Sequence, residues 1–311
     1  MNGVVIKSTG SWYEVRNTIG EVVKCRLKGI FRLDESKEKD SNPIAVGDRV
    51  VLERTDSGDL TIAEIEPRDN YILRSSPKHK GARQIIAANI DQALLIVTMA
   101  NPRTSTGFID RFLLTAEAYH IPVVIVFNKQ DLLDVKTQKK QEYVASIYQN
   151  IGYKTLFVSA LNREHIDEVQ ALMKDKTSLV SGHSGVGKST LMNAVEPTLN
   201  LRTMEVSRIT GKGMHTTTFA EMHPLSFGGG VIDTPGIREF GIMDFKPEEI
   251  SHYFVEMRAI LNDCKFNNCL HENEPGCAVK QAYQEGKIAE ERYINYLNIM
   301  IDYKASYKHW E

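Results

Sequence analysis

The sequence has little net charge, few cysteines and no hydrophobic run long enough to cross a bilayer. Its 38 basic and 40 acidic residues nearly balance, which excludes a polycation that coats nucleic acid along its whole length but leaves a local basic face open. The first residues also lack a long apolar segment behind a basic start. We therefore expect a cytoplasmic protein without a membrane partner, and nothing in the sequence requires more than a monomer.

The length predicts two or three domains, each with its own core. Region 1–69 is predicted to form five short strands, at 4–8, 12–16, 21–27, 48–53 and 61–65, separated by glycines. Such strands predict a small closed barrel, with the OB-fold as the leading candidate. In the third strand Lys24, Arg26 and Lys28 alternate with apolar residues, so the three cations share one face. That face is either a surface for a phosphate backbone or an ordinary solvated outer face.

Region 70–243 alternates apolar strands with amphipathic segments, which predicts a parallel α/β sheet with crossover helices. The expected strands are 93–97, 123–127, 155–158, 178–180 and 230–232, and helices are expected at 109–119 and 136–149. In region 244–311 the strands stop, and segments 247–262 and 287–307 are expected to be helical.

A phosphate-loop motif, Gly182-x-x-x-x-Gly187-Lys188-Ser189, follows one of these strands and leads into a helical segment. Its glycines allow backbone amides to surround phosphate oxygens, Lys188 reaches the terminal phosphates, and Ser189 is an expected Mg²⁺ ligand. The tetrapeptide beginning at Asp233 ends a later strand, where the carboxylate of Asp233 can bind a Mg²⁺-coordinated water and the amide of Gly236 can face the γ-phosphate.

Between these motifs lies a threonine-rich segment in the place of a first switch, and Thr217 is the expected Mg²⁺ ligand there. Ile237 stands where many GTPases have a water-orienting glutamine, so intrinsic hydrolysis should be slow. His215 or a partner is the candidate to complete the site.

The guanine-reading motif, Asn128-Lys129-Gln130-Asp131, precedes the phosphate loop in the chain, which is the reverse of the usual GTPase order. The carboxylate of Asp131 can accept hydrogen bonds from N1 and N2 of guanine, donors that adenine lacks. Asn128 is expected to tie this loop to the phosphate loop, and Ser159-Ala160-Leu161 to support the base through its backbone. The order indicates a circularly permuted nucleotide-binding domain.

Three of the four cysteines and a histidine crowd into a short stretch near the C-terminus. Cys264, Cys269, His271 and Cys277 supply three thiolates and an imidazole, enough to close a tetrahedral structural Zn²⁺ site with no open position. In a reducing compartment such a cluster points to metal and not to disulfides. The alternative is a set of free thiols beside an unrelated histidine.

With these motifs in place, the chain resembles the ribosome small-subunit-dependent GTPase A family over nearly its whole length. The resemblance implies an OB-fold barrel (1–69), a circularly permuted P-loop GTPase domain (70–243) and a helical zinc domain (244–311). It implies binding to the small ribosomal subunit and its rRNA late in maturation, with GTP hydrolysis stimulated by the subunit. The alternative is a GTP-regulated rRNA-binding scaffold whose hydrolysis is incidental, and an ATPase that does not bind RNA is disfavoured by Asp131.

The residues expected to contact GTP or GDP are Asn128, Lys129, Gln130, Asp131, Ser159, Ala160, Leu161, Gly182, His183, Ser184, Gly185, Val186, Gly187, Lys188, Ser189, Thr190, Asp233 and Gly236. Those expected to act in catalysis are Lys188, His215 and Thr217. Mg²⁺ is expected at Ser189, Thr217 and Asp233, and Zn²⁺ at the cysteine and histidine cluster.

Overall fold

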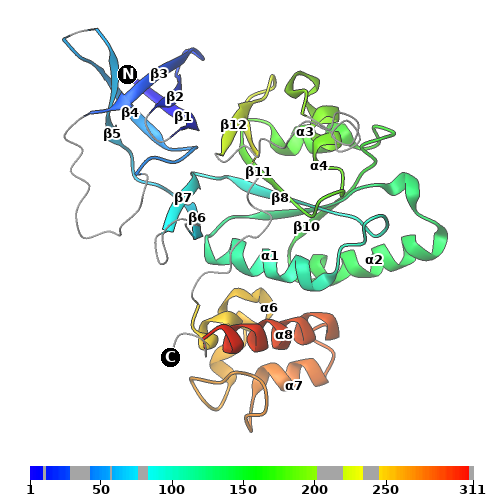
Figure 1. The fold of residues 1–311 in the computed structure, drawn as a ribbon. Helices are drawn as coiled ribbons and strands as arrows, with labels where there is room; N and C mark the ends of the chain where they lie inside the picture. Colours follow the sequence, from blue (N-terminus) through cyan, green and yellow to red (C-terminus); the bar gives the residue numbers. More distant parts are fainter. Residues whose placement is uncertain are drawn as a thin grey trace.

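The computed structural model describes residues 1–9, 12–28, 43–56, 58–75, 83–201, 220–233 and 245–307. A small barrel, a central sheet between helices and a C-terminal group of helices lie next to one another in this part of the chain (Figure 1). The three-part fold predicted from the sequence is therefore confirmed. No helix in the described ranges combines the length and the apolar character needed to cross a membrane.

The N-terminal barrel consists of β1 (Asn2–Ser8), β2 (Tyr13–Asn17), β3 (Val22–Leu27), β4 (Arg49–Arg54) and β5 (Leu60–Ile65). The strands pair in the order β1-β2-β3-β5-β4, and β4 pairs back onto β1 to close the barrel. Within β3, Cys25 is buried whereas Lys24 and Arg26 are exposed, as the period of two predicts. The expected five-stranded barrel is confirmed.

The central sheet contains β8 (Gln92–Val97), β9 (Val123–Phe127), β10 (Lys154–Phe157), β11 (Thr177–Ser181), β12 (Glu221–Pro224) and β13 (Gly230–Asp233). Its order is β10-β9-β8-β11-β13-β12, with parallel pairing from β10 to β13 and antiparallel pairing of β12. β12 in turn pairs with β1 at Lys7 and Glu221, whose side chains form an ion pair at 3.0 Å. The barrel and the central sheet are thus one continuous sheet. A separate hairpin, β6 (Tyr71–Ser75) and β7 (Arg83–Ala88), was not expected.

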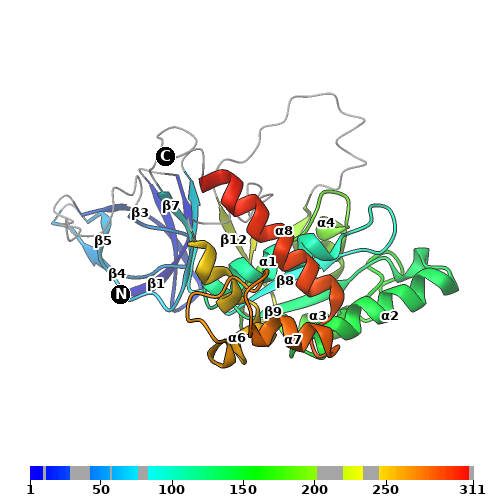
Figure 2. The same cartoon turned by 90° about the horizontal axis from the view of Figure 1, so that it is seen from below.

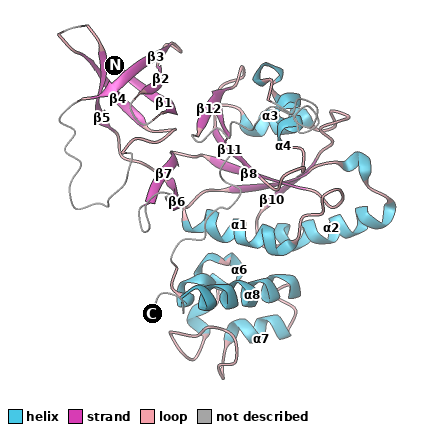
Figure 3. Ribbon diagram, viewed as in Figure 1, coloured by secondary structure: helices cyan, strands magenta, loops and turns pink. Residues whose placement is uncertain are grey.

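Helices cover both faces of the central sheet (Figures 1 and 3). α1 (Thr106–Ala118) and α2 (Val135–Gln149) lie on one face, and α3 (Ile166–Met173) and α4 (Lys188–Val195) lie on the other. Along β8, Leu95 and Val97 pack with α1 and α2, whereas Leu94 and Ile96 pack with α3 and α4. Burial on both sides explains why these strands are apolar runs without alternation. Two short 3₁₀ helices, η1 (Gln130–Leu132) and η2 (Pro197–Leu199), follow β9 and α4.

The C-terminal helices are η3 (Pro247–Tyr253), α6 (Val255–Arg258), η4 (Leu261–Asp263), α7 (Ala278–Gln284) and α8 (Glu290–Tyr307). The segment 247–262, expected to be helical, forms three short helices, and Phe254 takes an extended conformation (φ −96°, ψ 105°) that separates the first from the second. The Phe254 ring is fully buried and packs edge-on against Tyr296, so tertiary packing overrides the local helical pattern. α8 runs beside α1 (Figure 2).

Glu196, at the end of α4, joins that helix to the turn between β12 and β13. Its buried carboxylate accepts hydrogen bonds from the backbone N–H of Ser226 at 2.7 Å and from Thr198 Oγ1 at 2.6 Å. These bonds lower the pKa of Glu196 to about 2. Because its folded-state pKa lies below the ordinary value of 4.5, the carboxylate stabilises the fold above that pH, and the contribution is lost as the pH falls toward 2.

Replacing Glu196 with glutamine is expected to lower the free energy of unfolding at pH 7 by about 1.5–3 kcal/mol, because an amide N–H₂ then faces groups that donate. Urea unfolding at pH 7 and at pH 3 measures this loss, which should shrink at the lower pH. Glu142→Gln on the exposed side of α2 is the matched control. An unchanged urea midpoint for Glu196→Gln at pH 7 would contradict the assignment.

Candidate functional site

Asn128 joins three loops at the carboxyl edge of the central sheet. Its buried side chain donates from Nδ2 to the backbone oxygen of Val186 at 2.9 Å and accepts at Oδ1 from the backbone N–H of Ala160 at 3.1 Å. A Cβ at Gly187 would lie 2.5 Å from Asn128 Nδ2, so only glycine fits this approach. The tie between the two loops that the sequence predicts is present in the structure.

Asp131 is held in place by the Ser159 hydroxyl, which donates to Asp131 Oδ1. The same hydroxyl accepts the backbone N–H of Asn162 at 3.1 Å, so the loop after β10 fixes the carboxylate. Leu161 in that loop is 74% exposed, so a large apolar side chain faces solvent. The sequence indicated a backbone role for this loop and gave no signal for the Ser159 hydroxyl.

The other two side chains of this motif make different contacts. Lys129 has a left-handed backbone (φ 67°), and its ammonium group donates to the backbone oxygen of Asn101. Gln130 forms reciprocal amide hydrogen bonds with Gln141 of α2, at 3.0 and 2.8 Å. The side chain of Gln130 is thus hydrogen-bonded to α2, and any contact of this residue with a nucleotide base would come from its backbone.

The segment 182–189 turns from β11 into α4, which begins at Lys188. The Lys188 ammonium donates to the backbone oxygens of Gly182 at 2.7 Å and His183 at 2.8 Å. The His183 ring stacks on the Phe108 ring of α1 with centroids 3.6 Å apart. Ser189 and Thr190 lie in the first turn of α4, where their backbone N–H groups have no partner inside the helix. This is the strand, loop and helix geometry that binds phosphate groups.

Asp233 ends β13, which pairs in parallel with β11, so its backbone lies at the same sheet edge as the phosphate loop. The side chain of Asp233, like His215, Thr217 and Gly236, lies outside the part of the chain that the structure describes. Their expected roles stay predictions.

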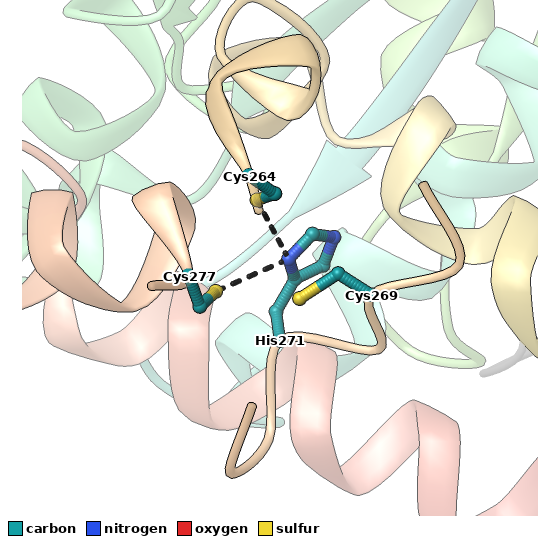
Figure 4. Close-up of side chains that lie close together, drawn as sticks. All are labelled: Cys264, Cys269, His271 and Cys277. Atoms are coloured by element: carbon teal, nitrogen blue, oxygen red, sulfur yellow. Dashed lines mark hydrogen bonds between the residues drawn. The ribbon is translucent and has the colours of Figure 1, made fainter. Parts of the chain in front are cut away.

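The cysteine and histidine cluster converges in the C-terminal helices (Figure 4). Its four donor atoms lie within 4.8 Å of one another. His271 Nδ1 is 3.7 Å from Cys264 Sγ and 3.4 Å from Cys277 Sγ. A tetrahedral Zn²⁺ site with bonds of about 2.3 Å to sulfur and about 2.0 Å to nitrogen has nitrogen–sulfur edges of roughly 3.5 Å. The donor spacing therefore fits a tetrahedral metal ion.

The surroundings of the cluster also suit a metal. Burial raises the pKa of Cys269 to about 12 and lowers that of His271, which keeps the imidazole in its neutral, ligating form. A cation is then needed to make the thiolates stable. Cys277 is the N-cap of α7 and its sulfur accepts the backbone N–H of Lys280 at 3.3 Å. Nδ1 of His271 is the nitrogen that faces Cys264 and Cys277 and is placed to ligate an ion, whereas Nε2 is buried with no hydrogen-bond partner among the described residues.

A hydrogen bond from Tyr293 to the His271 backbone oxygen (2.7 Å) and one from Tyr296 to that of Leu270 (2.8 Å) anchor the cluster loop to α8. These tyrosines and the two buried cysteines belong to one hydrophobic core, which also includes Leu114 of α1. The sequence pattern identified the four clustered side chains but not the tyrosines that hold their loop.

The motif 128–131 precedes the segment 182–189 in the chain, yet the two meet at one sheet edge, and this arrangement defines a circularly permuted P-loop GTPase. The family models named RsgA N-terminal domain and RsgA GTPase match residues 2–62 and 65–243. The chain therefore belongs to the RsgA GTPase family, and it is an enzyme that hydrolyses GTP.

Relatives and solved structures agree with this assignment. The chain is 50% identical to a small ribosomal subunit biogenesis GTPase of Flavobacterium psychrophilum, over 96% of this chain and 92% of that one. It is 48% identical to the protein of the same name in Bacteroides fragilis, over 99% and 100%. Its fold matches YjeQ from Thermotoga maritima (TM-score 0.79, 35% identity, 97% and 98% covered) and YloQ, described as a circularly permuted GTPase (TM-score 0.76, 31% identity, 98% and 95% covered).

Proposed function

We propose that this GTPase binds the small (30S) ribosomal subunit late in its maturation and hydrolyses GTP to GDP and phosphate at a rate that the subunit stimulates. The names of the full-length relatives support a role in small-subunit biogenesis. The position of Ile237 supports dependence on a partner, because isoleucine cannot polarise the attacking water. On this proposal the protein acts as a cytoplasmic monomer.

Within the nucleotide site, we assign guanine recognition to Asp131, with Lys129 over one face of the base and the exposed Leu161 against it. Lys188 would leave the loop carbonyls that it now contacts and bind the terminal phosphates. The family chemistry implies Mg²⁺ with the nucleotide. We assign the metal to Ser189, Thr217 and Asp233, and completion of the site to His215 or a partner group.

We further propose that the cluster ion is structural Zn²⁺, since four protein ligands leave no position for a substrate. When bound, it would hold the loop 264–277 against α8. The proposed domains are the barrel (1–69), the permuted GTPase domain (70–243) and the zinc domain (244–311), in line with the extents of the two family models.

We propose that the barrel contacts rRNA through the face that carries Lys24, Arg26 and Lys28. Lys28 pairs with Glu53 at 2.8 Å and Lys24 lies 3.9 Å from Glu14, whereas Arg26 lies over the Trp12 ring at 4.0 Å. An exposed aromatic ring beside cations suits stacking on unpaired bases together with phosphate contact.

The proposed function predicts that small subunits accelerate GTP hydrolysis strongly under multiple-turnover conditions, whereas large subunits do not. Phosphate release by the purified protein is measured alone, with small subunits and with large subunits. Equal slow rates in all three would favour the scaffold alternative, in which hydrolysis is incidental.

A further inference from the structure

The first turn of α1 touches the phosphate loop and α8 at the same time. On one side, the Phe108 ring stacks on His183 with centroids 3.6 Å apart and the ring planes tilted by 32°. On the other side, a Cβ placed on Gly107 would lie 3.3 Å from Asn295 Oδ1 of α8. Ser105 caps this turn by accepting the backbone N–H of Phe108 at 3.2 Å, which fixes the direction of the ring.

α8 holds this turn through a buried polar network. Asp110 is fully buried and accepts hydrogen bonds from Arg292 Nη1 at 2.7 Å, Asn295 Nδ2 at 2.6 Å and the Tyr148 hydroxyl at 2.9 Å. Arg292, 2% exposed, also forms a two-point ion pair with Glu256 of α6 at 2.7 and 2.8 Å. The two-point pair fixes the Arg292 guanidinium against α6. Asp110 of α1 accepts bonds from Arg292 and Asn295 of α8 on its two oxygens, and these buried bonds couple the position of α1 to that of α8.

The network is the centre of a longer contact along α1. Leu114, one turn after Asp110, packs in the core of the C-terminal helices, and Glu117, nearly one turn further, pairs with Arg258 at 3.1 Å. Figures 1 and 2 both show α8 running beside α1. α1 is thus attached along one face to the C-terminal helices, while its first turn contacts the phosphate loop.

His183 in turn contacts Lys188, the residue proposed to bind the terminal phosphates. Lys188 Nζ donates to the backbone oxygens of His183 and Gly182, so the direction of the lysine depends on where this half of the loop lies. A shift of the Phe108 ring is therefore expected to move His183 and, with it, the carbonyl oxygens from which Lys188 must turn to reach the terminal phosphates.

We propose that Phe108 is a positioning residue for GTP hydrolysis, which sets the phosphate loop through His183 and is itself held by the attachment of α8 to α1. Residues on α8 that do not belong to the phosphate loop, Asn295 first among them, then influence turnover, and a partner that displaces the C-terminal helices changes the same step. This route through α1 is separate from the covalent connection between β13 and η3. The inference rests on the proposed assignment of 182–189 as the phosphate loop.

The test compares single-turnover GTP hydrolysis and GDP affinity in the full-length protein without subunits. Phe108→Ala and Asn295→Ala are each expected to slow hydrolysis, by about 10- to 100-fold for Phe108→Ala, the scale for a reacting group misplaced by about 1 Å. GDP affinity should change by less than about threefold, because α- and β-phosphate binding rests mainly on loop amides. Phe108→Tyr, which keeps the ring, should restore the rate. Asn298→Ala, at an exposed position one turn away on α8, is the matched control and should behave as the parent.

The double variant Phe108→Ala/Asn295→Ala should slow GTP hydrolysis by less than the product of the two single fold-reductions in rate. The two effects are not independent, because both substitutions act on one series of contacts. If Asn295→Ala hydrolyses GTP as fast as Asn298→Ala, the link through α8 is wrong, even where Phe108→Ala alone fails to fold. If Phe108→Ala folds and keeps the parental rate, the positioning role is wrong. Lys188→Ala is measured in parallel, since full GTP binding and hydrolysis in that variant would overturn the phosphate-loop assignment itself and not the relay.

Discussion

Asp131→Asn is expected to lower the affinity for GTP by at least about 100-fold and to raise that for xanthosine triphosphate. The carboxylate would accept two hydrogen bonds from guanine, each worth about 1.5–3 kcal/mol when one partner is charged. An asparagine side chain keeps one acceptor but turns an N–H₂ group toward the N2 amino group of guanine. Xanthine has an oxygen at that position, so the new donor is satisfied there. Competition binding with GTP, xanthosine triphosphate and ATP measures the affinity for each nucleotide and so shows whether the preference changes from guanine to xanthine.

Asp134→Asn is a matched control for this variant. Asp134 lies three positions further along and caps α2 by accepting the backbone N–H of Thr137 at 2.7 Å. Asparagine caps helices about as well as aspartate, so this variant should keep its nucleotide preference. Unchanged GTP affinity in Asp131→Asn would mean that another group reads the base.

Removing the proposed Zn²⁺ is expected to unfold the C-terminal helices, because the cluster would tie the loop 264–277 to α7 and α8. Structural Zn²⁺ contributes about 10–16 kcal/mol of apparent binding free energy in small zinc domains, more than a core of this size supplies by itself. Cys277→Ser, or treatment with a strong chelator, should release one ion per chain and abolish amide-exchange protection in α7 and α8. Elemental analysis and hydrogen exchange measure the two effects.

Burial raises the pKa of Cys269 and Cys277, so both thiols are protonated near neutral pH in the metal-free protein. Binding of the metal must therefore release protons, and the affinity for the metal should rise with pH.

Cys25→Ala is the control for the metal experiment, because Cys25 is buried in the barrel and takes no part in the cluster. That variant should keep its metal and its C-terminal protection. Two results together would contradict the metal site. If the purified parent protein contains no metal, and α8 is protected from amide exchange equally well in the parent and in Cys277→Ser, the cluster is a set of free thiols.

The sequence predicted the parts of this protein whose signals are local. The barrel strands have period-two alternation, the central strands are uninterrupted apolar runs, and the Cys264 to Cys277 cluster is compact in the chain. Contacts between distant segments carry no such signal. Asp110 and Arg292 are 182 residues apart, and nothing near either position reveals the buried ion pair. The break at Phe254 has the same origin, because the core that buries its ring is assembled from later helices.

The pairing of β1 with β12 also protects the central sheet from self-association. A strand at the end of a sheet offers unpaired N–H and C=O groups to any other strand, and β12 would hold that position in the central sheet alone. β1 pairs with this edge at Lys7 and Glu221, so the ladder continues there into the barrel, which closes on itself through β4. The barrel therefore covers the start of β12 for the neighbouring domain, and separating the two would expose this edge to pairing with other strands.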